Sequence, residues 1–197
     1  MSAAIAAVIL AAGAGSRYGG DGHKLLATRP ANGTETPATV IERSLAHVVE
    51  SAIGPVIVIT GAAPDIVPAA RIDQVTVHHN PRWADGQMTS LRAGLDAAAE
   101  LGCSAVVVGL ADQPFITPAA WRTVATTSAP IAVATYDGRR GNPVRLESAV
   151  WALLPADGDE GARSLMRVRP DLVREVPCTG SPADIDTEED LRRWQNS

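Results

Sequence analysis

Hydrophobic and polar positions fall in blocks along the chain, and these blocks predict strands that alternate with helices. Short runs of apolar and β-branched residues are typical of buried strands, and they span residues 4–10, 55–60, 75–79, 105–110 and 131–135. The first, second and fourth runs are almost wholly apolar, as in parallel strands that are covered on both faces.

Segments with apolar residues at helical spacing lie between these runs, at 37–50 and 89–101. Thr117 followed by Pro118 is a capping residue with proline at the first helical position, which predicts a helix start. Residues 187–190 form a capping box with an acidic first turn, which predicts a helix near the C-terminus. The alternation favours an α/β fold in which helices cover both faces of a doubly wound, mostly parallel sheet.

The last third of the chain is less regular. Residues 136–142 are rich in turn-forming types and predict a connection between antiparallel strands. Residues 159–168 predict a short helix, and residues 172–176 predict a late strand. No repeat, linker or low-complexity segment divides the sequence, so we expect one domain over residues 1–197.

Composition disfavours several classes of protein. Hydrophobic residues make up 46% of the chain and charged residues 20%, which is ordinary for a globular protein. The net charge of −5 disfavours binding of nucleic acid through a basic surface, although a local pocket can still attract a small anion. No apolar run approaches the roughly 20 residues that span a bilayer, and the apolar stretch 5–12 lacks a preceding basic residue. Cys103 and Cys178 stand far apart, which favours reduced thiols and a cytoplasmic protein.

A glycine-containing loop carries the strongest chemical signal. The segment from Leu10 to Gly19 (LAAGAGSRYG) directly follows the first predicted strand, at the sheet edge where α/β folds bind ligands. Its glycines let the backbone approach a ligand, and its N–H groups can hold phosphate oxygens. Arg17 adds a bidentate phosphate partner, and Lys24, the only lysine of the chain, adds a compact charge. The alternative interpretation is a tight turn with two surface cations.

Two known phosphate motifs do not fit this loop. A P-loop requires serine or threonine directly after its lysine, and Leu25 follows Lys24. The dinucleotide fingerprint requires a third glycine at a fixed spacing, and Gly19 comes one position late. An arginine inside the turn also suits a triphosphate better than a dinucleotide pyrophosphate that rests on a helix N-terminus.

Two carboxylates are candidate metal ligands. Asp112 follows the predicted strand 105–110, and Asp186 precedes the C-terminal helix. Mg²⁺ prefers such oxygen ligands and bridges substrate phosphates, so this pair with Arg17 and Lys24 would position a triphosphate for in-line attack. The alternative for each carboxylate is a role in capping the turn or helix that follows it.

Seven motifs follow one another along nearly the whole chain: 10–17 (LAAGAGSR), 24–26 (KLL), 80–94 (NPRWADG, then SLRAG), 110–114 (LADQP), 140–144 (RGNPV), 158–163 (GDEGAR) and 184–190 (DIDTEED). In this order they resemble the motifs of the MobA-like nucleotidyltransferases, and the chain looks most like the molybdenum cofactor cytidylyltransferases among them. Three features depart from the family pattern. Tyr18 stands where methionine or phenylalanine is common. Lys24 stands farther from Arg17 than is common, and residues 27–36 are longer and more polar.

The resemblance implies a Rossmann-like fold of the nucleotide-diphospho-sugar transferase type and a Mg²⁺-dependent reaction. A terminal phosphate of molybdopterin or molybdenum cofactor would attack the α-phosphorus of the nucleotide and release pyrophosphate. Ala12 stands where guanylyltransferases of the family carry glycine, which favours CTP over GTP. The implied partners are these small molecules and a molybdenum hydroxylase as client, with no nucleic acid and no membrane.

The resemblance also implies roles for individual residues. Arg17, Lys24 and Asp112 would be catalytic, Asp112 and Asp186 would hold Mg²⁺, and Ser90 would meet the base. The implied nucleotide-binding residues are Leu10, Ala11, Ala12, Gly13, Ala14, Gly15, Ser16, Arg17, Lys24, Gly61, Gly86 and Ser90. The implied acceptor side spans 140–143 and 159–163, and its candidate binding residues are Gln113, Arg140, Gly141, Asn142, Pro143, Asp159 and Glu160.

Three alternative functions stay open. The same chemistry on a sugar phosphate or another phosphorylated acceptor is one, because function resides in loops carried by a shared fold. A protein that delivers molybdenum cofactor is the second, and it would need neither Asp112 nor Asp186. The third is an oxidoreductase, a description given to some proteins that resemble this family and act on a nicotine-derived pigment, although the sequence lacks a cofactor fingerprint.

Overall fold

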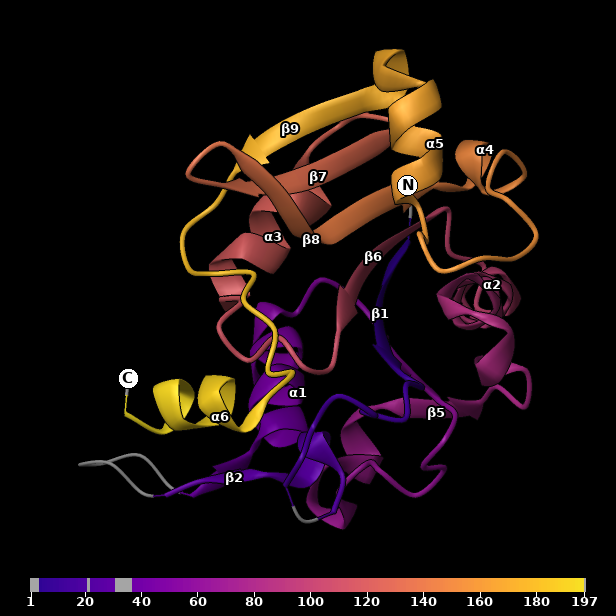
Figure 1. Cartoon of the computed structure of the whole chain (residues 1–197). Coiled ribbons are helices and arrows are strands. Elements are labelled where there is room, and N and C mark those ends of the chain that lie inside the picture. The colour runs from indigo at the N-terminus through magenta and orange to yellow at the C-terminus, as the bar shows by residue number, and fades with distance from the viewer. Residues whose placement is uncertain (1–3, 21, 31–36, 197) are drawn as a thin grey trace.

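A seven-stranded sheet with helices on both faces organises the chain (Figure 1). The computed structural model describes residues 4–20, 22–30 and 37–196. The strands of the sheet are β1 (Ile5–Ala11), β4 (Val56–Thr60), β5 (Thr76–His79), β6 (Ala105–Leu110), β7 (Ile131–Tyr136), β8 (Arg139–Glu147) and β9 (Val173–Pro177). A separate two-stranded ribbon pairs β2 (Thr28–Arg29) with β3 (Ala38–Thr39) in antiparallel fashion. Part of the polar stretch 27–36 lies outside the described residues.

The sheet has a parallel half and a mixed half. Its order is β5-β4-β1-β6-β8-β7-β9, and the strands from β5 to β6 all run parallel. β8 runs antiparallel to both of its neighbours, and β9 runs parallel to β7. The predicted fold, a doubly wound and mostly parallel sheet, is therefore confirmed. The three most apolar strands, β1, β4 and β6, lie next to one another in the sheet, as their burial on both faces requires.

Helices cover the two faces in separate groups. They are α1 (Val40–Ser51), α2 (Gln87–Glu100), α3 (Pro118–Thr126), α4 (Ser148–Trp151), α5 (Arg163–Val168) and α6 (Glu188–Gln195), with short 3₁₀ turns η1 (Lys24–Leu26), η2 (Ala69–Gln74), η3 (Trp83–Asp85) and η4 (Pro170–Leu172). Alternate residues of β1 separate the two groups: Ile9 packs with α1 and α3, whereas Val8 packs with α2. Figure 1 shows α2 on one side of the sheet and α1 with α3 on the other.

Helix starts follow the capping residues that the sequence predicts. The hydroxyl of Thr117 accepts a hydrogen bond from the Ala120 N–H at the start of α3, and Thr187 forms a capping box with Asp190 at the start of α6. The predicted helix 37–50 begins later, at Val40, because residues 38–39 pair with β2 and Thr39 is its N-cap. Among the described residues, no helix is both long enough and apolar enough to cross a membrane.

Two predictions for the last third need correction. The turn predicted over 136–142 is confined to Asp137 and Gly138, whose φ angles of 49° and 75° give a two-residue hairpin turn between β7 and β8. The helix predicted over 159–168 begins only at Arg163. Residues before it form a loop that docks on the start of α2, where the Met88 N–H donates to the Gly158 carbonyl at 2.9 Å.

Candidate active site

The glycine loop follows β1 at the carboxyl ends of the parallel strands. Gly15 adopts a φ of +66°, and a Cβ there would lie 3.1 Å from Cγ of Lys24, so the loop curls closely over the lysine. Gly13 has open space where a Cβ would stand. The Gly13 carbonyl lies 3.1 Å from Nε2 of His23, whose Nδ1 accepts a hydrogen bond from the Leu25 N–H. These contacts fix the loop relative to the turn that carries Lys24.

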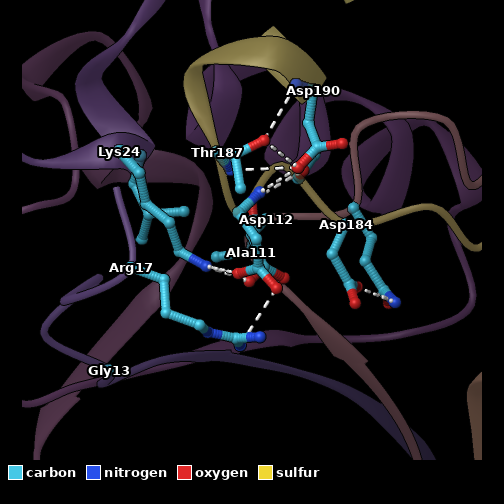
Figure 2. A network of polar contacts seen from close by, with 12 residues as sticks. Gly13, Arg17, Lys24, Ala111, Asp112, Asp184, Thr187 and Asp190 are labelled. Atoms are coloured by element: carbon cyan, nitrogen blue, oxygen red, sulfur yellow. Dashed lines mark hydrogen bonds and ion pairs between the residues drawn. The ribbon is translucent and has the colours of Figure 1, made fainter. Parts of the chain in front are cut away.

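Lys24 joins two carboxylates that are distant in sequence. Its Nζ donates to Oδ2 of Asp112 at 2.6 Å and to Oδ1 of Asp186 at 2.7 Å, and Arg17 contacts the other oxygen of Asp186 at 3.0 Å (Figure 2). Lys24 is only 9% exposed. Burial by itself lowers the pKa of Lys24, but the two carboxylates outweigh burial and hold that pKa above its ordinary value. The ammonium group therefore stays charged.

Backbone contacts explain why these carboxylates meet. Asp112 lies two residues after the end of β6, and the hydroxyl of Ser44 donates to the carbonyl of the intervening Ala111 at 2.9 Å. The Ile185 N–H donates to the Asp112 carbonyl at 2.9 Å, and the Ile185 side chain is buried in the core. The segment before α6 is thereby pinned beside β6, which brings Asp186 to Lys24.

The carboxylate pair fits a divalent cation. Oδ1 of Asp112 is buried and has no hydrogen-bond partner among the described residues, although buried carboxylate oxygens ordinarily have one. Mg²⁺ is commonly held by one or two carboxylates together with substrate phosphates and water. Within the described ranges, no group of three or more His, Cys, Asp or Glu side chains is arranged to hold a metal without such help. Asp112 and Asp186 thus match a metal that arrives with a phosphate ligand.

A cavity of about 640 Å³ opens at the glycine loop, and we call it the loop cavity. Its wall contains all of the predicted nucleotide-binding residues except Gly61, together with Asp112 and Asp186. Trp83, Gln87, Asp159, Arg163 and Asp184 also line it. Burial and the nearby Asp112 carboxylate raise the pKa of Asp184.

Gly61 supports the loop cavity from behind. A Cβ at this position would lie 2.5 Å from the Ala12 carbonyl and 2.6 Å from Cβ of Trp83, so only glycine fits there without a shift. Ser90 lines the cavity but is nearly buried, and its hydroxyl accepts a hydrogen bond from Asn80 at 3.0 Å. Asn80 also donates to Thr89 at 2.9 Å. Gly61 is thus not part of the wall of the loop cavity but permits a close approach of the chain next to it, and its predicted contact with the nucleotide stays a prediction.

A second cavity of about 390 Å³ lies between α2, α5 and the β6-β8-β7 part of the sheet, and we call it the apolar cavity. Aliphatic side chains form most of its wall, including Leu91, Val133 and Met166. Of the predicted acceptor residues, Arg140, Gly141, Asn142 and Glu160 line it. A bulge in the β7–β8 ladder shapes this wall. Val133 pairs with Val144 and the next residue, Ala134, pairs with Gly141, so Asn142 and Pro143 of β8 have no paired residue in β7.

Three predicted acceptor residues lie elsewhere. Asp159 lines the loop cavity, and its carboxylate accepts from the Gln87 N–H at 3.3 Å at the start of α2. Pro143 lines neither cavity. Gln113 is buried between the cavities, where its Oε1 accepts from Asn142 at 2.8 Å and its Nε2 donates to Asp184 at 2.6 Å. The sequence signal for Asp159 and Gln113 was a motif, which gives no direction for a side chain.

Known proteins resemble this chain over nearly its whole length. A family model described as the MobA-like NTP transferase domain matches residues 7–175. A curated relative, nicotine blue oxidoreductase from Paenarthrobacter nicotinovorans, is 29% identical over 96% of this chain and 95% of its own length. These matches confirm the resemblance that the seven motifs carry.

Solved structures agree with these matches. Rv0371c from Mycobacterium tuberculosis H37Rv is similar with a TM-score of 0.81 and 28% identity, and the match covers 100% of both chains. A complex of Rv0371c with manganese has a TM-score of 0.78 and 28% identity over 98% of each chain. The family model and the solved structures therefore both point to the fold of a nucleotidyltransferase, as the glycine loop after β1 also does.

Proposed function

The chain belongs to the MobA-like NTP transferase domain family, and on that premise we propose that it transfers CMP from CTP to the terminal phosphate of a molybdopterin-type acceptor. The observation that carries this proposal is the contact of Lys24 with Asp112 and Asp186 beneath the glycine loop. It unites a glycine loop suited to phosphate, a buried cation and two carboxylates suited to a divalent metal in one cavity. Such a set neutralises and orients a triphosphate, which is the main requirement of nucleotidyl transfer.

Asp112 and Asp186 would hold Mg²⁺. The unpartnered Oδ1 of Asp112 supports this assignment, as does the complex of the related Rv0371c with manganese. When bound, the metal would offset the charge of the phosphates and act as a Lewis acid at the reacting phosphorus.

The chain's own residues would bind and orient the two substrates. Arg17, Lys24 and the backbone N–H groups of the loop would hold the triphosphate, with Gly13 leaving room for its close approach. An oxygen of the acceptor phosphate would form a bond to the α-phosphorus, and the bond from that phosphorus to the bridging oxygen of pyrophosphate would break. The electron pair of that bond leaves with pyrophosphate, so the reaction is balanced without a redox partner.

The geometry supports separate positions for nucleotide and acceptor. The loop cavity carries the triphosphate-binding groups, whereas the apolar cavity adjoins it and carries arginines at its wall. Leu10, Gln87, Leu110 and Arg163 line both cavities, so two ligands would meet there. Ala12 favours CTP, and we propose that the pterin of the acceptor occupies the apolar cavity, where the arginines at the wall would attract its anionic phosphate. A molybdenum hydroxylase as client remains a prediction from the resemblance.

The name of one relative favours a second candidate, an oxidoreductase. Such an enzyme would need a nicotinamide or flavin site. The loop departs from the dinucleotide fingerprint at Gly19 and places Arg17 in the turn, which suits a triphosphate better. We therefore rank nucleotidyl transfer first and include oxidoreductase activity in the test.

The test measures pyrophosphate release by the purified chain with Mg²⁺ and molybdopterin, and compares CTP, GTP, ATP and UTP. We expect release with CTP and loss of release when Mg²⁺ is chelated. Release with GTP instead would keep the reaction and overturn the base assignment. Release only after molybdopterin is replaced by a sugar phosphate would overturn the acceptor assignment.

Two further results would reject nucleotidyl transfer itself. The first is an absence of nucleotide binding by calorimetry, which would leave delivery of the cofactor as the better hypothesis. The second is oxidation of NAD(P)H with the nicotine-derived pigment at a rate indifferent to chelation of Mg²⁺, which would favour the oxidoreductase.

A further inference from the structure

We propose that Arg163 bridges the two reacting phosphates, so that its guanidinium contacts the α-phosphate of the nucleotide and the attacking phosphate of the acceptor. This inference rests on the proposed function only in requiring two anionic substrates. The sequence places Arg163 within the acceptor segment alone. The structure places it on the walls of both the loop cavity and the apolar cavity.

The junction of the two cavities singles out this residue. Leu10, Gln87, Leu110 and Arg163 are the residues, within the part of the chain that the structure describes, that line both cavities. Arg163 carries the only charge among these four. A cation at the junction is what the reaction requires, because two phosphates that approach one another repel unless a positive charge lies between them.

Arg163 is also the arginine of the apolar cavity whose charge is available to a ligand. Arg140 pairs with Glu175 at 2.8 Å, and Arg167 pairs with Glu160 at 2.6 Å. Among the described residues, the Arg163 side chain makes no ion pair or hydrogen bond, although its charge helps to lower the pKa of the neighbouring Glu160. An exposed guanidinium without a fixed partner can turn towards a phosphate without breaking an existing contact.

The backbone beneath Arg163 is held in place. Its N–H donates to the Glu160 carbonyl at 3.0 Å, and the preceding loop is tied to α2 through the Met88 N–H and the Gly158 carbonyl. Gly86 lets this loop approach, because a Cβ there would lie 2.8 Å from the Gly158 carbonyl. Arginine suits such a fixed position, since its planar fork can donate to oxygens of two phosphates at once, whereas a lysine offers a single point charge.

The test compares Arg163→Gln, Arg163→Lys and Arg167→Gln with the unaltered chain. We expect Arg163→Gln to lower kcat about 100-fold, the effect of removing one hydrogen-bond donor to developing charge. The Kd for a non-hydrolysable CTP analogue should change less than threefold, because Arg17 and Lys24 still hold the triphosphate. Arg163→Lys should recover only part of kcat. Arg167→Gln should raise the KM for the acceptor and leave kcat nearly unchanged, because Arg167 lines the apolar cavity alone.

The matched control is Arg169→Gln, which removes an exposed arginine paired with Asp171 at the end of the same helix. Its kcat, its KM for the acceptor and its Kd for the CTP analogue should equal those of the unaltered chain. If the unaltered chain turns over and Arg163→Gln keeps kcat within threefold, the inference is overturned. Equal effects of Arg163→Gln and Arg167→Gln would overturn it as well, since a general electrostatic role would then suffice.

A binding measurement separates this inference from the proposed function. If the unaltered chain shows no turnover, calorimetry tests whether the CTP analogue with Mg²⁺ strengthens the binding of phenyl phosphate, a small apolar phosphomonoester. Loss of that mutual strengthening in Arg163→Gln, but not in Arg169→Gln, would support the bridge although the proposed acceptor had failed. If Arg163→Gln keeps the full mutual strengthening of the two ligands, the bridge is overturned. It is also overturned if the CTP analogue and phenyl phosphate bind the unaltered chain independently, or if either of them does not bind.

Discussion

The loop cavity and the apolar cavity share a border but differ in how they are built. The loop cavity gathers opposite charges, with Lys24 held between Asp112 and Asp186. The apolar cavity has aliphatic walls, with arginines that pair with surface carboxylates. The loop cavity therefore depends on a coupled set of charges, in which the loss of one charged group leaves the others without a partner. The second depends mainly on shape, so single changes there should be tolerated better.

On the proposed function, this difference would separate the residues that carry out nucleotidyl transfer from those that select the acceptor. Charges that hold a triphosphate can stay fixed while a cavity of aliphatic side chains is reshaped for another acceptor. The residues that line both cavities, such as Arg163, would then have to serve both the nucleotide and the acceptor.

Asp112→Asn should cause the largest loss of activity, because it removes a charge from the coupled set in the loop cavity. On the proposed function the amide would remove a metal ligand, and it also removes one of the two negative charges that face Lys24, so we expect pyrophosphate release to fall about 1000-fold, roughly 4 kcal/mol in the barrier. Initial rates at saturating CTP and Mg²⁺ measure this effect. The matched control is Asp171→Asn, which alters an exposed aspartate paired with Arg169 and should leave the rate unchanged. A rate within tenfold of the unaltered chain for Asp112→Asn would contradict the metal assignment.

Gly61→Ala and Gly13→Ala should separate support of the loop from contact with the ligand. The new methyl at position 61 would meet the Ala12 carbonyl at 2.5 Å, so we expect the free energy of unfolding to fall by about 1–3 kcal/mol. The methyl at position 13 meets no atom within 4 Å, so stability should hold while the affinity for CTP falls. Urea denaturation and calorimetric titration with CTP measure the two quantities. Equal losses of stability in both variants would contradict this division.

Arg140→Gln should weaken the apolar cavity alone. We expect kcat/KM for the acceptor to fall by at most about tenfold, because the cavity wall loses a positive charge near the proposed acceptor phosphate, although Arg140 already pairs with Glu175. The Kd for CTP should not change, since Arg140 does not line the loop cavity. Glu175→Gln is the matched control: it frees the Arg140 guanidinium and should keep acceptor kcat/KM at or above its original value. A change in the Kd for CTP in Arg140→Gln would show that the two cavities are coupled there.

The smallest effect, on the free energy of unfolding, should come from a change at Asp190. This residue holds the backbone beside Asp186, which lines the loop cavity. Its carboxylate accepts hydrogen bonds from the Thr187 hydroxyl at 2.7 Å and from the Asp186 N–H at 3.3 Å. The Thr187 side chain is the main reason that the pKa of Asp190 lies below its ordinary value. Because the pKa is lower in the folded state, this stabilisation is fully present above the unfolded value, which is about 4, and disappears as the pH falls through the folded value.

Unfolding experiments between pH 7 and pH 3 test this expectation. The difference in the free energy of unfolding between the unaltered chain and Asp190→Asn should be constant above about pH 5 and should shrink in the acidic range. Asp171→Asn cannot serve as the control here, because its pKa is also lowered by an arginine. Glu50→Gln is the better comparison, because the Glu50 carboxylate makes no such contact with any residue that the structure describes. A constant difference down to pH 3 would contradict a charged cap.

Local sequence rules predicted much of the fold. The apolar strands β1, β4 and β6 and the helix start at Thr117 follow from periodicity and capping, which act over a few residues. The glycine loop was predicted for the same reason, since its glycines, Arg17 and position after a strand are adjacent in the chain. The start of α5 was predicted too early, because the loop before it is held by α2, a contact that no local pattern records.

The contacts of the site depended on the tertiary structure. The order of the strands and helices follows from local patterns in the chain, because hydrophobic periodicity and caps act over a few residues. Only the fold decided that Lys24 meets Asp112 and Asp186, 88 and 162 residues away, and that Gln113 is buried between the cavities rather than in one of them. It also placed Gly61 behind the loop and Arg163 at the border. The reason is physical: the direction of a side chain is set by the packing of elements far apart in the chain, and packing is not encoded in the spacing of any one motif.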